Sequence, residues 1–148
     1  MANAFSQIYL HLVFSTKNRI DLISSDIEER VWAYIAGVAK AHRITPIQVG
    51  GINNHVHALV GVPTTISPAQ AAQYLKGDSS KWIRAELIPD FGWQDGYGVF
   101  SVSKSLIPAV TKYIHNQRQH HEKQSFEDEF VELLKLHEIE YDERYLFG

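Results

Sequence analysis

Two short groups of residues carry side chains suited to metal-assisted chemistry, and the first is His55-Val56-His57. Strand side chains alternate, so both imidazoles leave one face of a strand while Val56 enters the core. Two imidazoles at positions i and i+2 can converge on one divalent cation. The motif is short and frequent by chance, so a pair that merely decorates a half-exposed strand is the alternative. The pair is therefore weak evidence by itself.

The second group lies in the segment Tyr113-Ile114-His115-Asn116-Gln117. Tyr113 and Gln117 are four residues apart, so they share one face of a helix, which His120 and His121 continue. A phenol with a pKa of about 10 is a poor nucleophile at neutral pH. It becomes useful where a metal polarises a phosphate and a base or positive field removes its proton. Gln117 can add an oxygen ligand to that metal. The alternative is an ordinary tyrosine at a core edge.

The elements that position these groups follow from hydrophobic periodicity and turn residues. Strands are expected at residues 7–16, 44–49, 55–62 and 97–103, and helices at 26–42, 67–87, 105–121 and 126–139. The first six elements read βαββαβ, which predicts an α+β fold with a ferredoxin-like (RRM-like) antiparallel sheet. Additional C-terminal helices follow, and one of them carries Tyr113. Both early helices should cover one sheet face and leave the other free, with His11 beside the His55/His57 pair on that open face.

The chain of 148 residues is expected to be a single domain. It divides into a βαββαβ core (1–104), a tyrosine helix (105–121) and an acidic C-terminal helix and tail (122–148). No cysteine is present, which excludes disulfides, thiolate zinc sites and cysteine nucleophiles, so Mg²⁺ or Mn²⁺ suits the available ligands best. The first residues lack a basic leader and no apolar run is long enough to span a membrane, which predicts a cytoplasmic protein.

The net charge of −3 hides a division between the tail and the rest. Residues 122–148 hold nine acidic and three basic residues, whereas the other 121 residues hold eleven basic and eight acidic ones. A solvated acidic helix is the simpler interpretation of the tail. Charge alone does not indicate a nucleic-acid partner.

Taken together, the motifs resemble the IS200/IS605-type transposases, the single-tyrosine branch of the HUH endonucleases. Six ordered segments carry the resemblance across nearly the whole chain: 11–19, 54–57, 75–83, 93–103, 113–117 and 141–146. No departure occurs at a position with a chemical role.

The resemblance implies a homodimer that cuts and rejoins single-stranded DNA at hairpin-bearing transposon ends. It assigns Tyr113 as the nucleophile that forms a 5′-phosphotyrosine link, and His55, His57 and Gln117 as metal ligands. It also implies that the tyrosine helix can complete a partner's active site. The residue spacing agrees with these roles but does not name the reaction.

Several further residues are tentative DNA contacts. They are His11, Lys17, Arg19, Lys76, Lys81, Arg84 and Lys104. Lys17 and Arg19 follow a central strand at the sheet edge and are the better phosphate ligands. For Lys76, Lys81 and Arg84 a solvated helix face is at least as good an interpretation. Lys104 lies where a helix cap is the alternative.

Three other functions compete with a transposase. A replication-initiator or relaxase-like HUH nuclease generally has further domains or a differently spaced tyrosine motif. A non-catalytic ferredoxin-like nucleic-acid binder would not need an intact set of His55, His57, Tyr113 and Gln117. A metal-dependent hydrolase would not need Tyr113.

Overall fold

The computed structural model describes residues 4–147 and contains one four-stranded antiparallel sheet. Its strands are β1 (Tyr9–Ser15), β2 (Thr45–Ile52), β3 (His55–Gly61) and β4 (Gly98–Val102). They lie in the order β2-β3-β1-β4, so β1 and β3 are the central pair. The predicted ferredoxin-like arrangement is confirmed.

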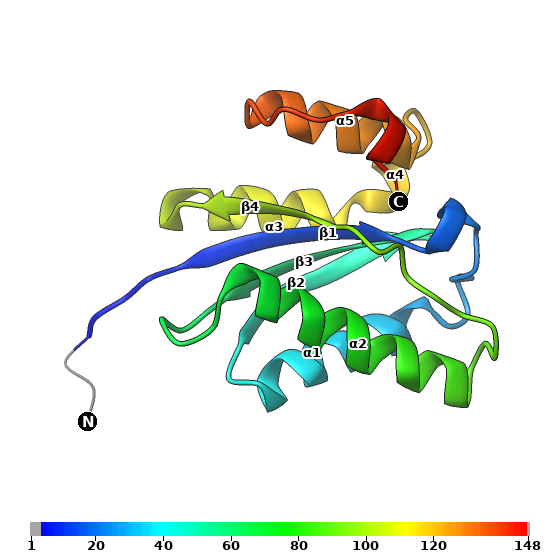
Figure 1. Cartoon of the computed structure of the whole chain (residues 1–148), viewed down its shortest axis with the longest axis horizontal. Helices are drawn as coiled ribbons and strands as arrows, with labels where there is room; N and C mark the ends of the chain where they lie inside the picture. Colours follow the sequence, from blue (N-terminus) through cyan, green and yellow to red (C-terminus); the bar gives the residue numbers. More distant parts are fainter. Residues whose placement is uncertain (1–3, 148) are drawn as a thin grey trace.

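The first face of the sheet is covered by α1 (Glu28–Ala41) and α2 (Pro68–Glu86), as Figure 1 shows. Helix α2 starts at a capping box, in which the Ser67 hydroxyl accepts from the Gln70 amide N–H and Gln70 reaches back to Ser67. Apolar side chains from every layer fill the space between helices and sheet. This main core includes Leu12, Phe14, Ile35, Val56, Leu75 and Ile83.

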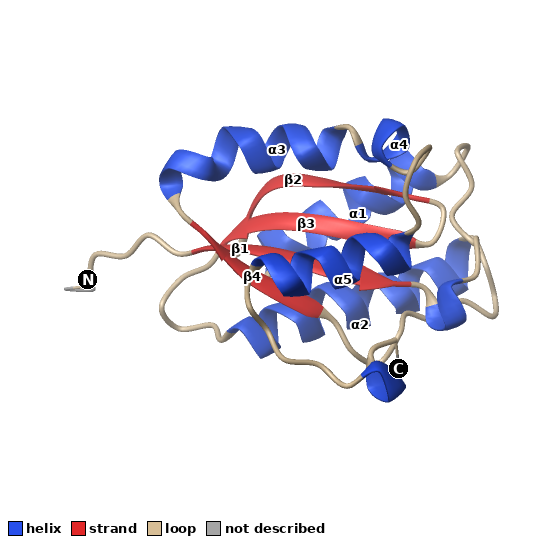
Figure 2. Ribbon diagram, turned by 90° about the horizontal axis from the view of Figure 1, so that it is seen from above, coloured by secondary structure: helices blue, strands red, loops and turns tan. Residues whose placement is uncertain are grey.

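The second face of the sheet is also covered, so the expectation of a free face is wrong. Helices α3 (Ile107–His115), α4 (Gln117–His120) and α5 (Phe126–Leu136) lie over it (Figures 1 and 2). A smaller apolar cluster packs α5 against β1 and β4 and consists of Val13, Phe100, Phe126, Phe130 and Leu134. The α5 helix is amphipathic, and burial of its apolar stripe requires a partner surface, which the sheet provides.

Two glycines let these helices approach the sheet closely. A side chain at Gly50 in β2 would meet Ile114 of α3, with the nearest atom 3.0 Å from the added carbon. One at Gly98 in β4 would meet the Phe130 ring of α5 at 2.7 Å. Because only glycine leaves room at such distances, both positions fix how deeply the second layer of helices sits.

The C-terminal part departs from the predicted single helix over residues 105–121. A 3-10 turn (Lys104–Leu106) precedes α3, and the helix breaks at Asn116, whose ψ of 22° interrupts the regular path before α4. The segment 122–148 is not simply solvated, because α5 buries Phe126, Glu129 and Phe130. Within residues 4–147, no helix has the length and apolar character needed to cross a bilayer.

Candidate metal centre and nucleophile

The two histidines of β3 point into the space between the sheet and the second layer of helices. His55 and His57 are both 0% exposed, because α4 and α5 cover the strand that presents them. His11 of β1 lies on the same face, and its Nε2 is 2.8 Å from His57 Nδ1. The strand alternation inferred from the sequence therefore gathers three imidazoles, but in a closed site rather than on an open surface.

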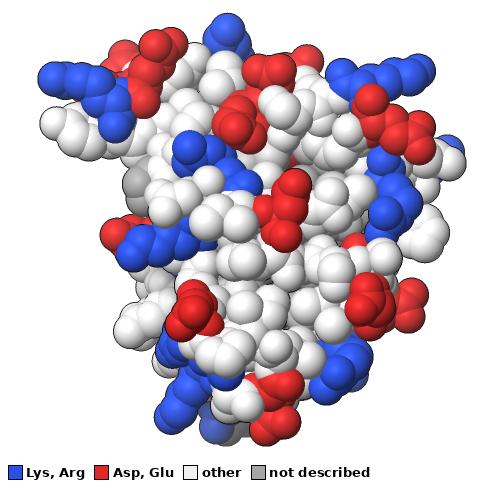
Figure 3. Space-filling view, turned by 90° about the vertical axis from the view of Figure 1, so that its right-hand side faces the viewer, with Lys and Arg blue, Asp and Glu red and all other residues white. Residues whose placement is uncertain are grey.

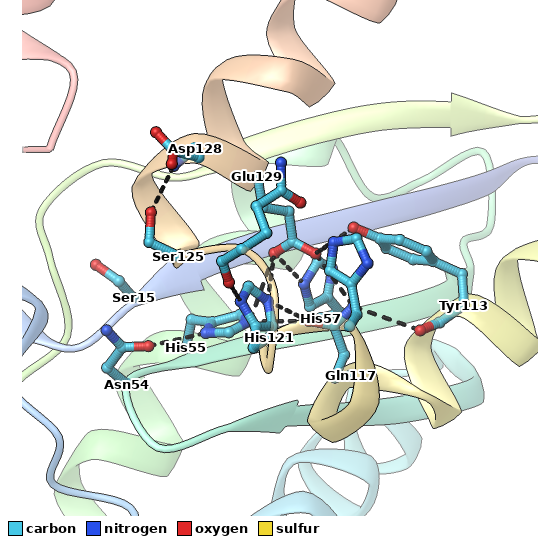
Figure 4. Close-up of polar contacts among 12 residues, drawn as sticks. Ser15, Asn54, His55, His57, Tyr113, Gln117, His121, Ser125, Asp128 and Glu129 are labelled. Atoms are coloured by element: carbon cyan, nitrogen blue, oxygen red, sulfur yellow. Dashed lines mark hydrogen bonds and ion pairs between the residues drawn. The ribbon is translucent and has the colours of Figure 1, made fainter.

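Three more side chains come from α4, the turn after it and α5. They are Gln117, His121 and Glu129. Glu129 Oε1 lies 3.0 Å from His57 Nε2, 3.1 Å from His121 Nε2 and 3.5 Å from His55 Nε2. Gln117 Oε1 lies 2.9 Å from the Nε2 atoms of His55 and His121. Figure 4 shows these side chains converging from β3 and the C-terminal helices on one point.

The hydrogen-bond network around His55 directs the lone pair of His55 Nε2 toward the lone pairs of Gln117 Oε1. Asn54 donates its amide to the Arg19 carbonyl, so its Oδ1 accepts from His55 Nδ1 at 2.9 Å. Burial, followed by the charge of His57, lowers the pKa of His55 to about 3, so the ring is neutral and its Nε2 holds a lone pair. Gln117 donates its amide to Glu129 and to the Tyr113 carbonyl, which turns its Oε1 toward the same lone pair.

A bound cation would remove the unfavourable contact between these two acceptors. Ligand atoms of His55, His57, His121 and Glu129 all lie within 4.8 Å of one another. Three imidazoles, one carboxylate and the Gln117 amide oxygen match the nitrogen and oxygen ligands of divalent first-row metals. The contact of His55 Nδ1 with Asn54 is the kind of outer partner that orients a histidine ligand. The residues therefore fit a divalent metal.

Glu129 is the electrostatic centre of the cluster. Burial opposes its ionisation, but the charge of His57 and hydrogen bonds from His121 and His57 outweigh burial and hold the pKa of Glu129 well below its usual range. His121 responds in the opposite sense. Burial lowers its pKa, yet the hydrogen bond to Glu129 and that carboxylate's charge raise the pKa of His121 overall. The buried carboxylate is ionised and shared among imidazoles.

Tyr113 lies beside this cluster in the same chain. Its ring centroid is 5.6 Å from that of His57 and 6.3 Å from that of His11. The Tyr113 hydroxyl donates to Glu129 Oε2. Burial, and then the negative charge of Glu129, raise the pKa of Tyr113 far above its ordinary value, so the phenol keeps its proton in this arrangement. The expected nucleophile, a carboxylate acceptor and a candidate metal-binding cluster are thus adjacent.

The predicted basic contacts near β1 have different surroundings. Lys17 is exposed, whereas Arg19 pairs with Glu127 at 3.5 Å and lies over the Phe147 ring at 4.7 Å. Lys76 donates to the carbonyls of Asp95 and Gly96, so its ammonium already holds a loop. DNA contact by Lys17 remains the simplest of these three predictions.

The other basic residues lie away from the cluster. Lys81 and Arg84 are on α2, over the opposite sheet face, and Arg84 donates to the Phe91 carbonyl at 3.3 Å. Lys104 follows the far end of β4, with its ammonium 5.7 Å from the Tyr9 ring. Figure 3 shows Lys and Arg interspersed with Asp and Glu on the molecular face it presents. DNA contacts by these residues stay predictions.

Sequence reasoning missed Glu129 and did not assign His121 as a ligand. A signal for Glu129 was present, because it falls between Phe126 and Phe130 on the apolar stripe of an amphipathic helix. An acidic residue in such a stripe has to be paired or to bind a metal. His121 was placed on the face of Tyr113 and Gln117, but nothing local distinguishes it from His120.

Comparisons with known proteins identify a sequence family and structures of similar fold. Residues 4–117 match the sequence model described as "Transposase IS200 like". No curated protein gives a significant match. A candidate transposase from Deinococcus radiodurans R1 has a similar structure, with a TM-score of 0.65, 18% identity and coverage of 79% of this chain and 95% of that one. A REP-associated tyrosine transposase bound to a REP hairpin gives 0.60 and 10%, covering 82% and 73%. At these identities the two likenesses support the fold.

Proposed function

Because this chain belongs to the IS200-like transposases, which cut and transfer DNA strands, we propose that it cleaves and rejoins single-stranded DNA through a 5′-phosphotyrosine intermediate. The observation that carries the proposal is the place of the Tyr113 hydroxyl, which contacts the same Glu129 carboxylate that binds His57 and His121. Hairpin-bearing transposon ends are the proposed substrate. The REP hairpin bound by the structurally similar transposase supports that choice.

In the proposed reaction Tyr113 Oη forms a bond to the scissile phosphorus while the bond from phosphorus to the 3′ oxygen breaks. The 3′ oxygen takes a proton and leaves as a free hydroxyl, and the 5′ phosphate stays on Tyr113. A later attack by a 3′-hydroxyl reverses these changes and releases the tyrosine. No nucleotide cofactor is needed, because the phosphotyrosine link conserves the energy of the broken phosphodiester bond.

Glu129 is the group placed to receive the phenol proton, since its Oε2 already accepts the Tyr113 hydrogen bond. Its depressed pKa makes Glu129 a weak base. Proton transfer should therefore accompany bond formation to phosphorus rather than precede it.

His55, His57, His121, Gln117 and Glu129 would hold the metal, Mg²⁺ or Mn²⁺. When bound, the ion supplies Lewis-acid polarisation of the phosphate. Three imidazoles favour Mn²⁺ over Mg²⁺, which prefers oxygen ligands and water. His11 would act through His57, by fixing the ring whose Nδ1 it contacts.

We propose that the active site is assembled within one chain. The distance of 5.6 Å between the ring centroids of Tyr113 and His57 of the same chain supports this arrangement. A homodimer with exchanged tyrosine helices remains a prediction from the family resemblance. Mixing Tyr113→Phe with His57→Ala protein tests it, because only exchange between chains would restore an intact site.

The proposal is tested by incubating the protein with labelled single-stranded hairpin DNA from the flanks of its own gene and running a denaturing gel. With Mn²⁺ or Mg²⁺ present, we expect a covalent protein–DNA band that Tyr113→Phe and His57→Ala abolish. Tyr145→Phe and His115→Ala are the matched controls, because both residues are exposed, and they should retain the band. Cleavage that survives Tyr113→Phe would instead identify a metal-dependent hydrolase. Binding without any covalent band would identify a DNA-binding protein.

A further inference from the structure

Two hollows of different character meet at Tyr113. One is a cavity of about 400 Å³ bounded by β1, β4, α3 and α5, and its lining is mostly apolar. The other is an open groove of about 870 Å³ between α3, α4 and α5. Tyr113, His120 and Glu132 line both of them. The nucleophile proposed above therefore stands at the junction between an apolar cavity and a polar groove.

The apolar cavity is lined by aromatic and aliphatic side chains, which suit an apolar ring. Phe100 of β4 and His137 after α5 stack with ring centroids 4.4 Å apart and an interplanar angle of 26°. Val110 of α3 and Leu133 of α5 form opposing aliphatic walls. Its volume falls within the range of small-molecule pockets, roughly 300–1,000 Å³, and so can admit one nucleobase with part of its sugar.

The polar groove offers groups that suit a sugar–phosphate backbone. Lys112 and Lys123 line it together with the amides of Asn116 and Gln119. Asp128 and Glu132 line it too, so the groove is mixed in sign rather than uniformly basic. Lysine ammonium and amide N–H groups are the common donors to phosphate oxygens.

His120 supplies a second observation that points to a ligand at the junction. Its Nε2 is buried and has no hydrogen-bond partner, although Glu129 Oε2 lies 3.5 Å away. The ring is 5.3 Å from Tyr113 between centroids. A buried polar atom without a hydrogen bond is costly, and a substrate at the junction of the two hollows would give it one.

We propose that the apolar cavity receives the nucleobase next to the scissile phosphate, while the adjoining backbone lies in the groove along Lys112 and Lys123. This inference rests on the proposed function. Tyr113 lines the cavity and would also attack the phosphorus, so the group that enters the cavity has to be bonded to that phosphate. A nucleobase meets the requirement and stacks on aromatic side chains regardless of its identity. The cavity thus positions the phosphate by holding the base beside it.

The test follows methyl and amide NMR signals of the full chain during titration with the tetranucleotide dT4 and with an abasic tetramer of the same sugar–phosphate backbone. With dT4 we expect the methyl signals of Val110 and Leu133 to move, while those of Leu75, in the core of the opposite face, stay fixed. The abasic tetramer should move the Lys112 amide signal without moving the methyl signals of the cavity.

A substitution that fills the cavity makes the test more specific. Val110→Trp should weaken dT4 binding about tenfold, the scale of one stacked base, and leave abasic binding unchanged. Lys135→Trp is the matched control, because Lys135 is an exposed α5 residue that lines neither hollow, and it should change neither affinity.

Several outcomes overturn the inference. The first two are cavity methyl signals that dT4 leaves unmoved, and a Val110→Trp substitution that weakens the binding of both oligonucleotides equally. The other two are the absence of any binding at millimolar dT4, and methyl signals that shift with protein concentration when no DNA is present. The last outcome would mean that a second copy of the chain fills the cavity. A covalent band on the gel together with unmoved methyl signals would refute the base pocket alone. Moved methyl signals without a band would refute strand transfer and, with it, the assignment of the bound base to a scissile phosphate.

Discussion

The two faces of the sheet bury their side chains in different ways. On the first face, under α1 and α2, the inner strand residues are apolar, such as Leu12 and Val56 at 0% exposure. On the second face the same two strands present His11, His55 and His57, buried almost as completely at 4%, 0% and 0%. The strands are shared, so the contrast comes from alternate positions along one backbone.

The difference shows how one small sheet combines stability with a reactive site. Apolar burial on the first face is favourable wherever the packing is tight. Polar burial on the second face costs free energy unless each group has a partner. Here Asn54 accepts from His55, Glu129 contacts His57, and Gln117 donates to Glu129. The first face should therefore dominate stability at neutral pH, and the second should dominate its dependence on pH and metal.

Acidification should have the largest effect, and it acts through the second face. Burial lowers the pKa of both His11 and His55 from 6.5 to about 3, so the unfolded chain binds more protons and stability falls as pH drops from 6.5 toward 3. Glu129, whose pKa is also lowered, adds a loss below 4.5, whereas the raised pKa of His121 adds stability only as the pH falls to 6.5 from above. The expected loss without metal is on the order of 5 kcal/mol, comparable to the whole stability of a domain.

Urea unfolding followed by circular dichroism across this pH range measures the effect. His11→Phe removes one of the two histidines and should flatten the profile, whereas His115→Ala on the exposed side of α3 should not. A wild-type stability that does not change between about pH 6.5 and about pH 4 would mean that the second face is not the acid-sensitive layer.

Truncation in the first core should have the next largest effect. Leu75 of α2 is 0% exposed, and Leu75→Ala should lower the free energy of unfolding by about 2–5 kcal/mol through lost burial and a residual cavity. Leu136→Ala, at a residue that is 76% exposed, should change it by about 0.5 kcal/mol or less. Chemical denaturation at pH 7 compares them, and similar values for both would break the assignment of stability to the first face.

The gain in stability on metal addition should depend on the second face and not on the first. Mn²⁺ at a hundred times its dissociation constant should stabilise the wild type by about 2.7 kcal/mol, since it binds only the folded cluster. Glu129→Leu should abolish this gain, because it removes the one carboxylate among the ligands. Leu75→Ala should keep the gain despite its lower stability. Thermal melts with Mn²⁺ and with EDTA provide the measurement, and an equal gain in Glu129→Leu would place the metal elsewhere.

The smallest effect is expected where an ion pair joins the layers at the edge of the sheet. Arg118 of α4 pairs with Glu28 of α1 at 2.6 Å, but the arginine side chain is 54% exposed. Solvent screening limits such a pair, so Arg118→Ala should cost about 1 kcal/mol or less, and less still at high salt. A loss well above that in melts at low and high salt would show that the edge contact holds α4 in place.

The fold and half of the site could be predicted from local patterns. Strand alternation gave the two faces of β1 and β3, and the element order gave the sheet topology, because both depend on neighbouring residues and short connections. The same alternation gave His11, His55 and His57 a common side. The resemblance to a transposase family, carried by motifs along the chain, is confirmed by the family match over residues 4–117.

The covering of the second face could not be predicted in this way. Nothing in residues 122–139 says against which surface the apolar stripe of α5 will pack, so the helix was interpreted as solvated and the sheet face as free. The break at Asn116 and the turn over residues 121–125, after which α5 packs on the sheet, are likewise tertiary features. Local propensity is a weak guide where packing decides.

The amino-acid sequence by itself therefore determined the alternation of side chains along the strands, the histidine pair and the Tyr113–Gln117 spacing, since each is set by the geometry of one element. Only the tertiary structure decided that Glu129, 72 residues beyond His57, binds that histidine and Tyr113 together. The reason is physical. A buried carboxylate is stable only among compensating imidazoles, and those imidazoles come from β3 and the segment after α4, which only the packing of α5 brings together.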